Sequence, residues 1–140
     1  MQAPLYPRAE SARVPTVVFF CCEADCPIGK ATNLYEVECT LASAVVASAD
    51  AFHGDASAAN RSVTCWRDVS DGEGPFEPLF KAFDAAEAVV AYNAFGYCFP
   101  LLAKYYGRAQ ASKDRLMRHR LKCLDPVSIK PTHTRESQTM

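Results

Sequence analysis

Several features that would assign a protein class directly are missing from the sequence. It has no run of about eighteen apolar residues, so no membrane-spanning helix is expected. Residues 1–15 have no apolar stretch typical of a secretory signal and are expected to form a disordered lead. There is no internal repeat and no glycine-rich phosphate loop. We therefore expect an intracellular protein, cytoplasmic or nuclear, without a membrane partner.

Cysteine is abundant instead, with seven residues in a chain of 140. The number is odd, no secretory signal is expected, and no two cysteines have the CxxC spacing of many zinc sites. A secreted disulfide framework is therefore unexpected. Several of the cysteines stand in apolar runs, where a thiol behaves as a small hydrophobic group. The cysteines are Cys21, Cys22, Cys26, Cys39, Cys65, Cys98 and Cys123.

The charge is unevenly distributed, although the net charge is only −1. Residues 1–103 carry six Lys or Arg against thirteen acids, whereas residues 104–140 carry nine against three. A basic segment of this kind either contacts phosphates or docks on the acidic part of its own chain.

The apolar patterns predict one mixed α/β domain over residues 16–125, followed by a disordered tail over 126–140. A continuous β-branched run predicts a buried strand, period-two alternation predicts a strand with one wet face, and an i, i+3, i+4, i+7 stripe predicts a helix. The predicted strands are 16–22, a strand within 34–48 whose alternation begins at Tyr35 and runs to Leu41, 63–66 and 88–92. The predicted helices are 74–87, 95–107 and, in the basic segment, 111–122; residues 123–126 form a short strand or turn.

Two stretches carry a resemblance to a known family. They are "VVFFCCEADCP", residues 17–27, and "AYNAFGYCFPLL", residues 91–102. They resemble two motifs of the DEDD-type 3′–5′ exonuclease domain, the proofreading domain of family B DNA polymerases, which has a ribonuclease H-like fold. The resemblance implies a three-stranded antiparallel meander followed by helix, strand and helix. It covers roughly residues 17–125, so the domain is C-terminally truncated relative to the family.

The resemblance assigns positions to individual residues. Cys21 and Glu23 stand at the Asp and Glu of the first motif, and Cys98 stands at the Asp of the second. These three are vestigial catalytic positions, with Glu23 as the one retained metal ligand. The Tyr-Asn pair of the second motif is matched by Tyr92 and Asn93, and these residues, with Tyr97, are expected to bind substrate.

The lost acids predict weak or absent metal binding. The family hydrolyses phosphodiesters with two divalent cations, Mg²⁺ or Mn²⁺, which require oxygen ligands. A thiol is soft and mostly protonated near neutral pH, so it is a poor replacement. The third motif, with its final acid, has no counterpart. Rescue by Asp25, two residues after Glu23, would shift the site by about 7 Å along the strand.

Other roles for the cysteines stay open. Under the family fold, Cys21 is expected to face Cys98 while Cys22 points away. A zinc site made by Cys21, Cys26, Cys98 and Glu23, a Cys21–Cys98 disulfide, and free thiols in a decayed site are the alternatives.

Four functions follow. The first is a degenerate exonuclease-like domain that binds single-stranded DNA, another nucleic acid or a polymerase partner. The others are an active DNA exonuclease completed by other ligands or a partner chain, a non-catalytic interaction module, and a metal-thiolate or redox protein. Without the family's final helix, an apolar sheet face is expected to be uncovered and to favour a homo-oligomer.

Overall fold

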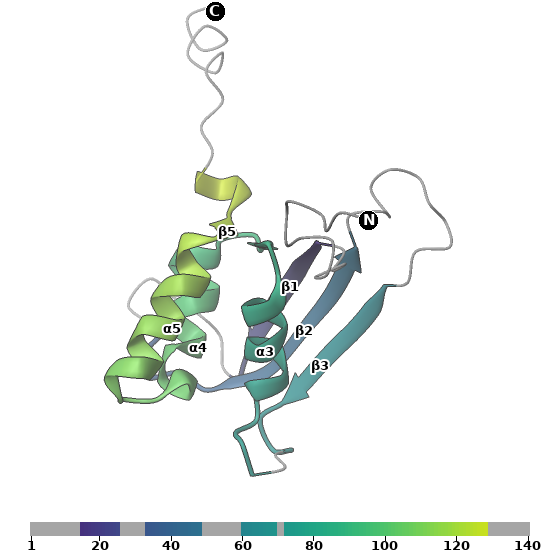
Figure 1. The fold of residues 1–140 in the computed structure, drawn as a ribbon. Helices are drawn as coiled ribbons and strands as arrows, with labels where there is room; N and C mark the ends of the chain where they lie inside the picture. The colour runs from purple at the N-terminus through teal and green to yellow at the C-terminus, as the bar shows by residue number, and fades with distance from the viewer. Residues whose placement is uncertain (1–14, 26–32, 49–59, 70–71, 129–140) are drawn as a thin grey trace, which may run out of the picture.

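A computed structural model describes residues 15–25, 33–48, 60–69 and 72–128 of the chain (Figure 1). The protein is α/β, with a five-stranded mixed sheet and three α-helices. The strands are β1 (Thr16–Ala24), β2 (Cys39–Ser48), β3 (Arg61–Trp66), β4 (Ala88–Val90) and β5 (Cys123–Leu124). The helices are α3 (Glu77–Ala85), α4 (Phe99–Tyr106) and α5 (Gln110–Leu121), with a π-helix η1 (Ala94–Cys98) and a 3₁₀ turn η2 (Pro126–Ser128).

The sheet has the strand order β3-β2-β1-β4-β5. β2 is antiparallel to both of its neighbours, whereas β4 is parallel to β1 and β5 is parallel to β4. The predicted meander of three strands, and the predicted strand beside the first, are therefore confirmed.

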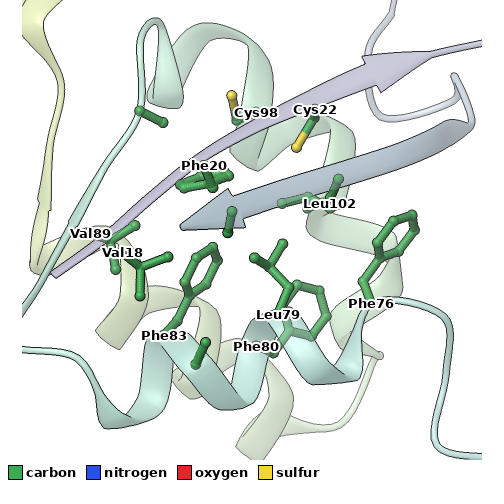
Figure 2. Close-up of a cluster of buried hydrophobic side chains, with 14 of the residues drawn as sticks. Val18, Phe20, Cys22, Phe76, Leu79, Phe80, Phe83, Val89, Cys98 and Leu102 are labelled. Carbon is green, nitrogen blue, oxygen red and sulfur yellow. The ribbon is translucent and has the colours of Figure 1, made fainter. Parts of the chain in front are cut away.

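One face of the sheet is covered by helices. Val18, Phe20 and Cys22 of β1 are buried against this layer, as alternation along a strand requires. The ring of Phe20 lies 4.8 Å from that of Phe83 on α3 and 5.8 Å from that of Phe99 on α4, measured between centroids. Figure 2 shows this aromatic and aliphatic core between the strands and the helices.

The other face of the sheet is bare of described helices (Figure 1). The alternate residues of β1, which are Phe19, Cys21 and Glu23, are exposed on it. Their register partners on β2 are Val45, Ser43 and Leu41, and Trp66 of β3 stands opposite Leu41. Phe19 is 39% exposed, Val45 45% and Trp66 54%, so an uncovered and largely apolar face is present, as the sequence predicted.

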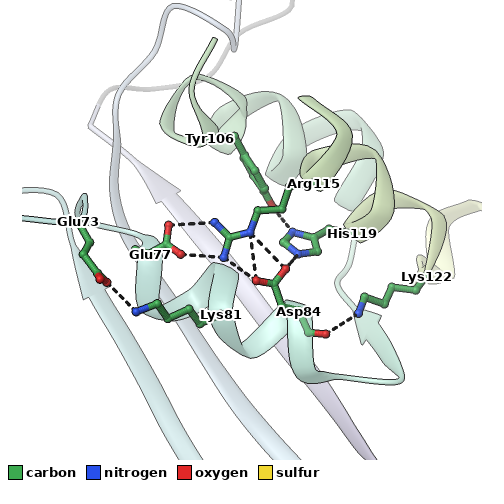
Figure 3. A network of polar contacts seen from close by, with 8 residues as sticks. All are labelled: Glu73, Glu77, Lys81, Asp84, Tyr106, Arg115, His119 and Lys122. Atoms are coloured by element: carbon green, nitrogen blue, oxygen red, sulfur yellow. Dashed lines mark hydrogen bonds and ion pairs between the residues drawn. The ribbon is translucent and has the colours of Figure 1, made fainter. Parts of the chain in front are cut away.

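A network of charged and polar side chains docks α5 onto α3 (Figure 3). The Arg115 guanidinium donates to both oxygens of Glu77, at 3.0 and 2.7 Å, and to the carboxylate of Asp84 at 2.7 Å. These hydrogen bonds raise the pKa of Arg115 further above its ordinary value. Part of the basic segment thus docks on the acidic part of its own chain, one of the two predicted alternatives.

His119 is the buried centre of the same network, with 1% of its surface exposed. Its Nε2 lies 2.6 Å from Asp84 Oδ1 and its Nδ1 lies 2.7 Å from the Tyr106 hydroxyl. Because a carboxylate only accepts, Nε2 carries the proton, and Nδ1 of the neutral ring accepts from Tyr106. Burial lowers the pKa of His119 despite the carboxylate beside it, which keeps the ring neutral.

The boundaries of the second strand and of the second helix differ from the predictions. The second strand begins at Cys39 rather than at residue 35, because Asn33 forms a turn: its Oδ1 accepts from the Tyr35 amide at 3.0 Å. The predicted helix over 95–107 is divided into η1 and α4, while the basic segment is helical as expected. The predicted lead and tail lie outside the described residues, apart from Pro15 and the turn η2.

Candidate functional site

The candidate site lies where β4 ends beside β1: Val90 pairs with Phe19, and β1 continues to Ala24 beyond it. β1 has an antiparallel neighbour on one side and the parallel strand β4 on the other. In open α/β sheets, ligands bind outside the carboxyl ends of strands where the strand order reverses direction. Both stretches that carry the family resemblance adjoin this point: the first includes β1, and the second begins directly after β4.

The chain after β4 has an unusual conformation. Asn93 adopts the left-handed region (φ 55°), the only described non-glycine residue with a positive φ. Its carbonyl then accepts from the amides of Tyr97 at 2.9 Å and Cys98 at 3.3 Å, the second being an i+5 bond that belongs to η1. A Cβ on Gly96 would stand 2.5 Å from Asn93 Oδ1, so a larger residue there would force the Asn93 side chain to move. Such π-helical turns are rare and often occur at functional sites.

The side chain of Asp125 holds this turn in place through hydrogen bonds to its backbone. Its buried carboxylate accepts from the backbone amides of Asn93 at 2.9 Å, Phe95 at 3.4 Å and Val127 at 3.0 Å. Burial alone would raise the pKa of Asp125, but these amide hydrogen bonds hold it below its ordinary value. Asp125 could not be placed relative to the site from the sequence alone. Its role is that of an anchor for the turn, and its carboxylate oxygens are occupied by amides.

Three buried cysteines belong to three neighbouring elements, and we call them the thiol cluster: Cys22 of β1, Cys39 of β2 and Cys98 of η1. Their exposed fractions are 8%, 0% and 2%. Hydrogen bonds with Cys39 and with Cys98, together with burial, raise the pKa of Cys22 well above its ordinary value. The hydrogen bond with Cys22 lowers the pKa of Cys39, although burial opposes this. Figure 2 shows Cys22 and Cys98 at one end of the core.

The start of β2 is held in place by α4, which positions Cys39. The Tyr105 hydroxyl accepts from the Cys39 amide at 3.2 Å and donates to Glu38 Oε2 at 3.3 Å. Lys104 forms an ion pair with the same carboxylate. Burial raises the pKa of Tyr105 to about 12, so its hydroxyl stays protonated.

The expectation that Cys21 faces Cys98 is wrong. Cys21 is exposed on the bare face of the sheet, together with Glu23, whereas Cys98 is buried under the helical layer beside Cys22. Adjacent residues of a strand point to opposite faces, so a shift of one residue exchanges the two cysteines. The roles assigned to Cys21, Glu23 and Cys98 as vestigial catalytic positions stay predictions, but the structure does not bring the first two together with the third.

The residues predicted to bind substrate lie around the turn. Tyr92 is 75% exposed and Asn93 is exposed, so both are accessible from solvent. Tyr97 is half-buried and packs against the core. Burial and the neighbouring thiols raise its pKa.

A search of the described residues finds no group of three or more His, Cys, Asp or Glu side chains placed to hold a metal ion. In the predicted zinc set, Cys26 lies outside the described residues, and Cys21 and Glu23 point away from Cys98. The sequence missed the pairing of Cys22 with Cys39, and the available signal was the alternation of Val18, Phe20 and Cys22 along one face.

Within the described part of the chain, none of the helices has the length and apolar character needed to cross a membrane. Comparisons of the sequence with protein-family models and with curated proteins found no match.

Proposed function

We propose that this chain is a degenerate exonuclease-like domain with a ribonuclease H-like fold, which binds single-stranded nucleic acid without hydrolysing it. The fold part of the proposal is supported by the strand order β3-β2-β1-β4-β5 with only β2 reversed. The function part is supported by the position of both motif-bearing stretches at the carboxyl ends of β1 and β4.

The single observation that carries the proposal is that Cys98 and the residues of β1 on its side of the sheet, Cys22 and Ala24, offer no carboxylate. An Asp-x-Glu motif needs two residues on the same side of the strand, and the side that meets Cys98 carries Cys22 and Ala24. Neither residue offers an oxygen ligand, and Cys98 offers none either. A two-metal site at this point would have no carboxylate from these three positions, so phosphodiester hydrolysis by it is not expected.

Nucleic-acid binding is supported by what surrounds the turn. The exposed Tyr92 offers an aromatic face for stacking of a base. On the nearby helix α5, the guanidinium of Arg120 lies 5.8 Å from the ring centroid of Phe95 within η1, and Arg118 is exposed. Exposed aromatic rings and cations are the two kinds of group that bind single strands, and Tyr92 and Arg118 supply one of each.

The test is an assay of the full chain with a fluorescently labelled oligodeoxynucleotide, in Mg²⁺ and then in Mn²⁺. We expect no hydrolysis and an anisotropy increase that weakens with added salt. Tyr92→Ala should weaken binding, and Tyr35→Ala, at another exposed tyrosine, should not. Metal-dependent hydrolysis that is abolished by Glu23→Ala would contradict the proposal and favour an active nuclease.

Acid restoration tests the site itself. The triple variant Cys22→Asp/Ala24→Glu/Cys98→Asp should bind Mn²⁺ in isothermal titration calorimetry more tightly than the original chain. The matched control, Cys21→Asp/Cys98→Asp, should not, because its two carboxylates lie on opposite faces of the sheet. Binding by the control alone would show that the first motif acts through Cys21 and Glu23.

The bare sheet face favours a second candidate, a non-catalytic interaction module. Its exposed side chains include Phe19, Val45 and Trp66. If the chain shows no salt-dependent binding to oligonucleotides, this candidate replaces the first.

A further inference from the structure

The outer edge of β3 carries main-chain groups that no described strand pairs with. β3 stands at one end of the strand order, so among the described strands only β2 lies beside it (Figure 1). The Arg67 amide, directly after β3, donates to the Thr40 carbonyl of β2 at 2.9 Å. Main-chain groups alternate in direction along a strand, so those of Ser62 and Thr64 point away from β2. Their N–H and C=O groups therefore face the open side of the sheet.

A small hollow lies against the same edge, where β3 ends. Its volume is about 210 Å³, and its lining includes Thr64, Cys65 and Trp66 of β3, Val69, and Pro75 and Pro78 beside the start of α3. Trp66 is 54% exposed and Val69 is 67% exposed, so the hollow opens to solvent. Pockets for drug-sized molecules measure about 300–1,000 Å³. This hollow is smaller and mostly apolar, which suits a single apolar side chain.

We propose that the open edge of β3 and the hollow beside it bind an extended peptide segment of a partner protein, which adds a sixth strand to the sheet. In strand addition, the edge supplies main-chain hydrogen bonds and pockets for alternate side chains supply specificity. An extended segment offers free N–H and C=O groups to Ser62 and Thr64, whereas in a helix these groups are bonded to each other. The proposal goes beyond the proposed function and is independent of it, since β2 separates β3 from β1 and the candidate site.

Arg61, at the amino end of β3, favours an acidic residue in the peptide. Its side chain is exposed and lies on the same side of the strand as that of Cys65, about 13 Å away. We expect the peptide to be antiparallel to β3, because antiparallel pairs are slightly more stable than parallel ones. The peptide residue opposite Cys65 then enters the hollow, and the residue four positions later stands opposite Arg61. The expected motif is an apolar residue followed four positions later by Asp or Glu.

A second copy of this chain does not carry this motif in β3. If Val63 of another copy stood opposite Cys65, Arg67 of that copy would stand opposite Arg61, where the motif requires an acid. Like charges directly opposite each other destabilise a pair of strands. The partner is therefore expected to be a different chain.

The first experiment titrates the full chain with four synthetic peptides of the pattern X-Thr-Val-Thr-Glu, in which X is Val, Leu, Ile or Phe. The chain has a single tryptophan, and it lines the hollow, so tryptophan emission reports on occupancy. We expect at least one unlabelled peptide to shift the emission of Trp66 to the blue, and its fluorescein-labelled form to gain anisotropy. No binding by any of the four up to about 1 mM would overturn the proposal.

N-methylated peptides test whether the main chain is bound as a strand. Methylation of the two Thr amides, which stand opposite Thr64 and Ser62, removes the hydrogen bonds to β3 and should abolish binding. The matched control carries methyl groups on the Val and Glu amides, which point away from β3, and should bind about as well as the parent peptide. Equal effects of the two methylation patterns would overturn the proposal.

Variants of the protein test the hollow and the charge. Val69→Ala should weaken binding about fivefold, whereas the matched control Val45→Ala, on the bare face of the sheet, should not change it. Arg61→Glu should weaken binding of the parent peptide about fivefold and strengthen binding of the peptide in which Lys replaces Glu. Circular dichroism confirms that the variants fold.

Three results of these measurements would overturn the proposal. One is binding that neither Val69→Ala nor Arg61→Glu changes, and another is binding that Val45→Ala weakens as much as Val69→Ala does, which would place the peptide on the bare face. The third is a dimer in sedimentation analysis that excludes the peptides, which would assign the edge to a second copy of the chain.

Discussion

The two faces of β1 carry neighbouring cysteines in opposite surroundings. Cys21 is exposed on the bare face between Phe19 and Glu23, while Cys22 is buried under the helices in contact with Cys39 and Cys98. A motif aligned by its letters does not distinguish the two, because an error of one residue moves a side chain to the other side of the sheet. The face on which a residue lies therefore decides which cysteine belongs to the candidate site.

The largest expected effect is the difference between Phe20→Ala and Phe19→Ala. Phe20 fills the space between Phe83 and Phe99, so its truncation should lower the free energy of unfolding by about 3–5 kcal/mol. Phe19 is 39% exposed, and its truncation should cost about 1 kcal/mol. Urea denaturation measures both values. Equal costs would contradict the assignment of the two faces.

The next effect concerns the two cysteines themselves. Cys22→Asp places a carboxylate in a dry cluster without a cation, and we expect it to cost about 3 kcal/mol at neutral pH. Cys21→Asp places the same carboxylate in solvent and should change stability by less than about 0.5 kcal/mol. The same denaturation experiment compares them, and a larger loss for Cys21→Asp would reverse the assignment.

A smaller effect is expected at the anchor of the turn after β4. Asp125→Ala leaves the amides of Asn93, Phe95 and Val127 without their acceptor, which should cost about 1–3 kcal/mol. The variant should also speed alkylation of Cys98, because η1 begins at this turn. Asp114→Ala on the exposed side of α5 is the control and should change neither quantity. An Asp125→Ala protein as stable as the control would show that the turn is stable without hydrogen bonds to this carboxylate.

The smallest effect is a pH dependence that belongs to the helix-covered side. Burial lowers the pKa of His119 in the folded state, so between that value and about 6.5 the unfolded state binds more protons. Its contribution to stability is therefore complete above about pH 6.5 and is lost as the pH falls through the folded pKa. The groups that face His119 are Asp84, Arg115, Tyr106 and Lys122.

Thermal unfolding between about pH 7 and pH 5 measures this dependence. The melting temperature of the original chain should fall over this range, and that of His119→Gln should fall less. The pKa of Asp84 is also held low, by Arg115 and His119 against the effect of burial, but its contribution is lost only at more acidic pH. A rise in melting temperature on acidification would contradict the neutral state assigned to His119.

Much of the fold follows from local patterns. The β-branched run predicted β1, the stripe of Phe76, Leu79, Phe80 and Phe83 predicted α3, and the meander with a fourth strand beside the first is as expected. The start of β2 was predicted four residues too early because the hydrogen bond from Tyr35 to the Asn33 side chain overrides the alternating pattern. Strand boundaries depend on such turns more than on periodicity.

The contacts of the candidate site could be predicted from the sequence less well than the fold. Contacts between Cys22, Cys39 and Cys98 depend on register, on a bulge after Glu23 and on the left-handed turn at Asn93, none of which the pattern specifies. The contact of Arg115 with Glu77 joins residues 38 positions apart. Pairings at this separation are set by how α5 packs against α3, and the charge distribution indicated only that some such docking was available.

The most direct test of the two faces is the rate at which Cys21 and Cys22 are alkylated in the native protein. Iodoacetamide labelling is stopped at increasing times, and fragmentation mass spectrometry assigns the label to either residue. Cys21 should react as an exposed thiol, and Cys22 should react at least about tenfold more slowly, because it requires local opening of the strand end. Faster labelling of Cys22 than of Cys21 would contradict the placement of Cys22 beside Cys98.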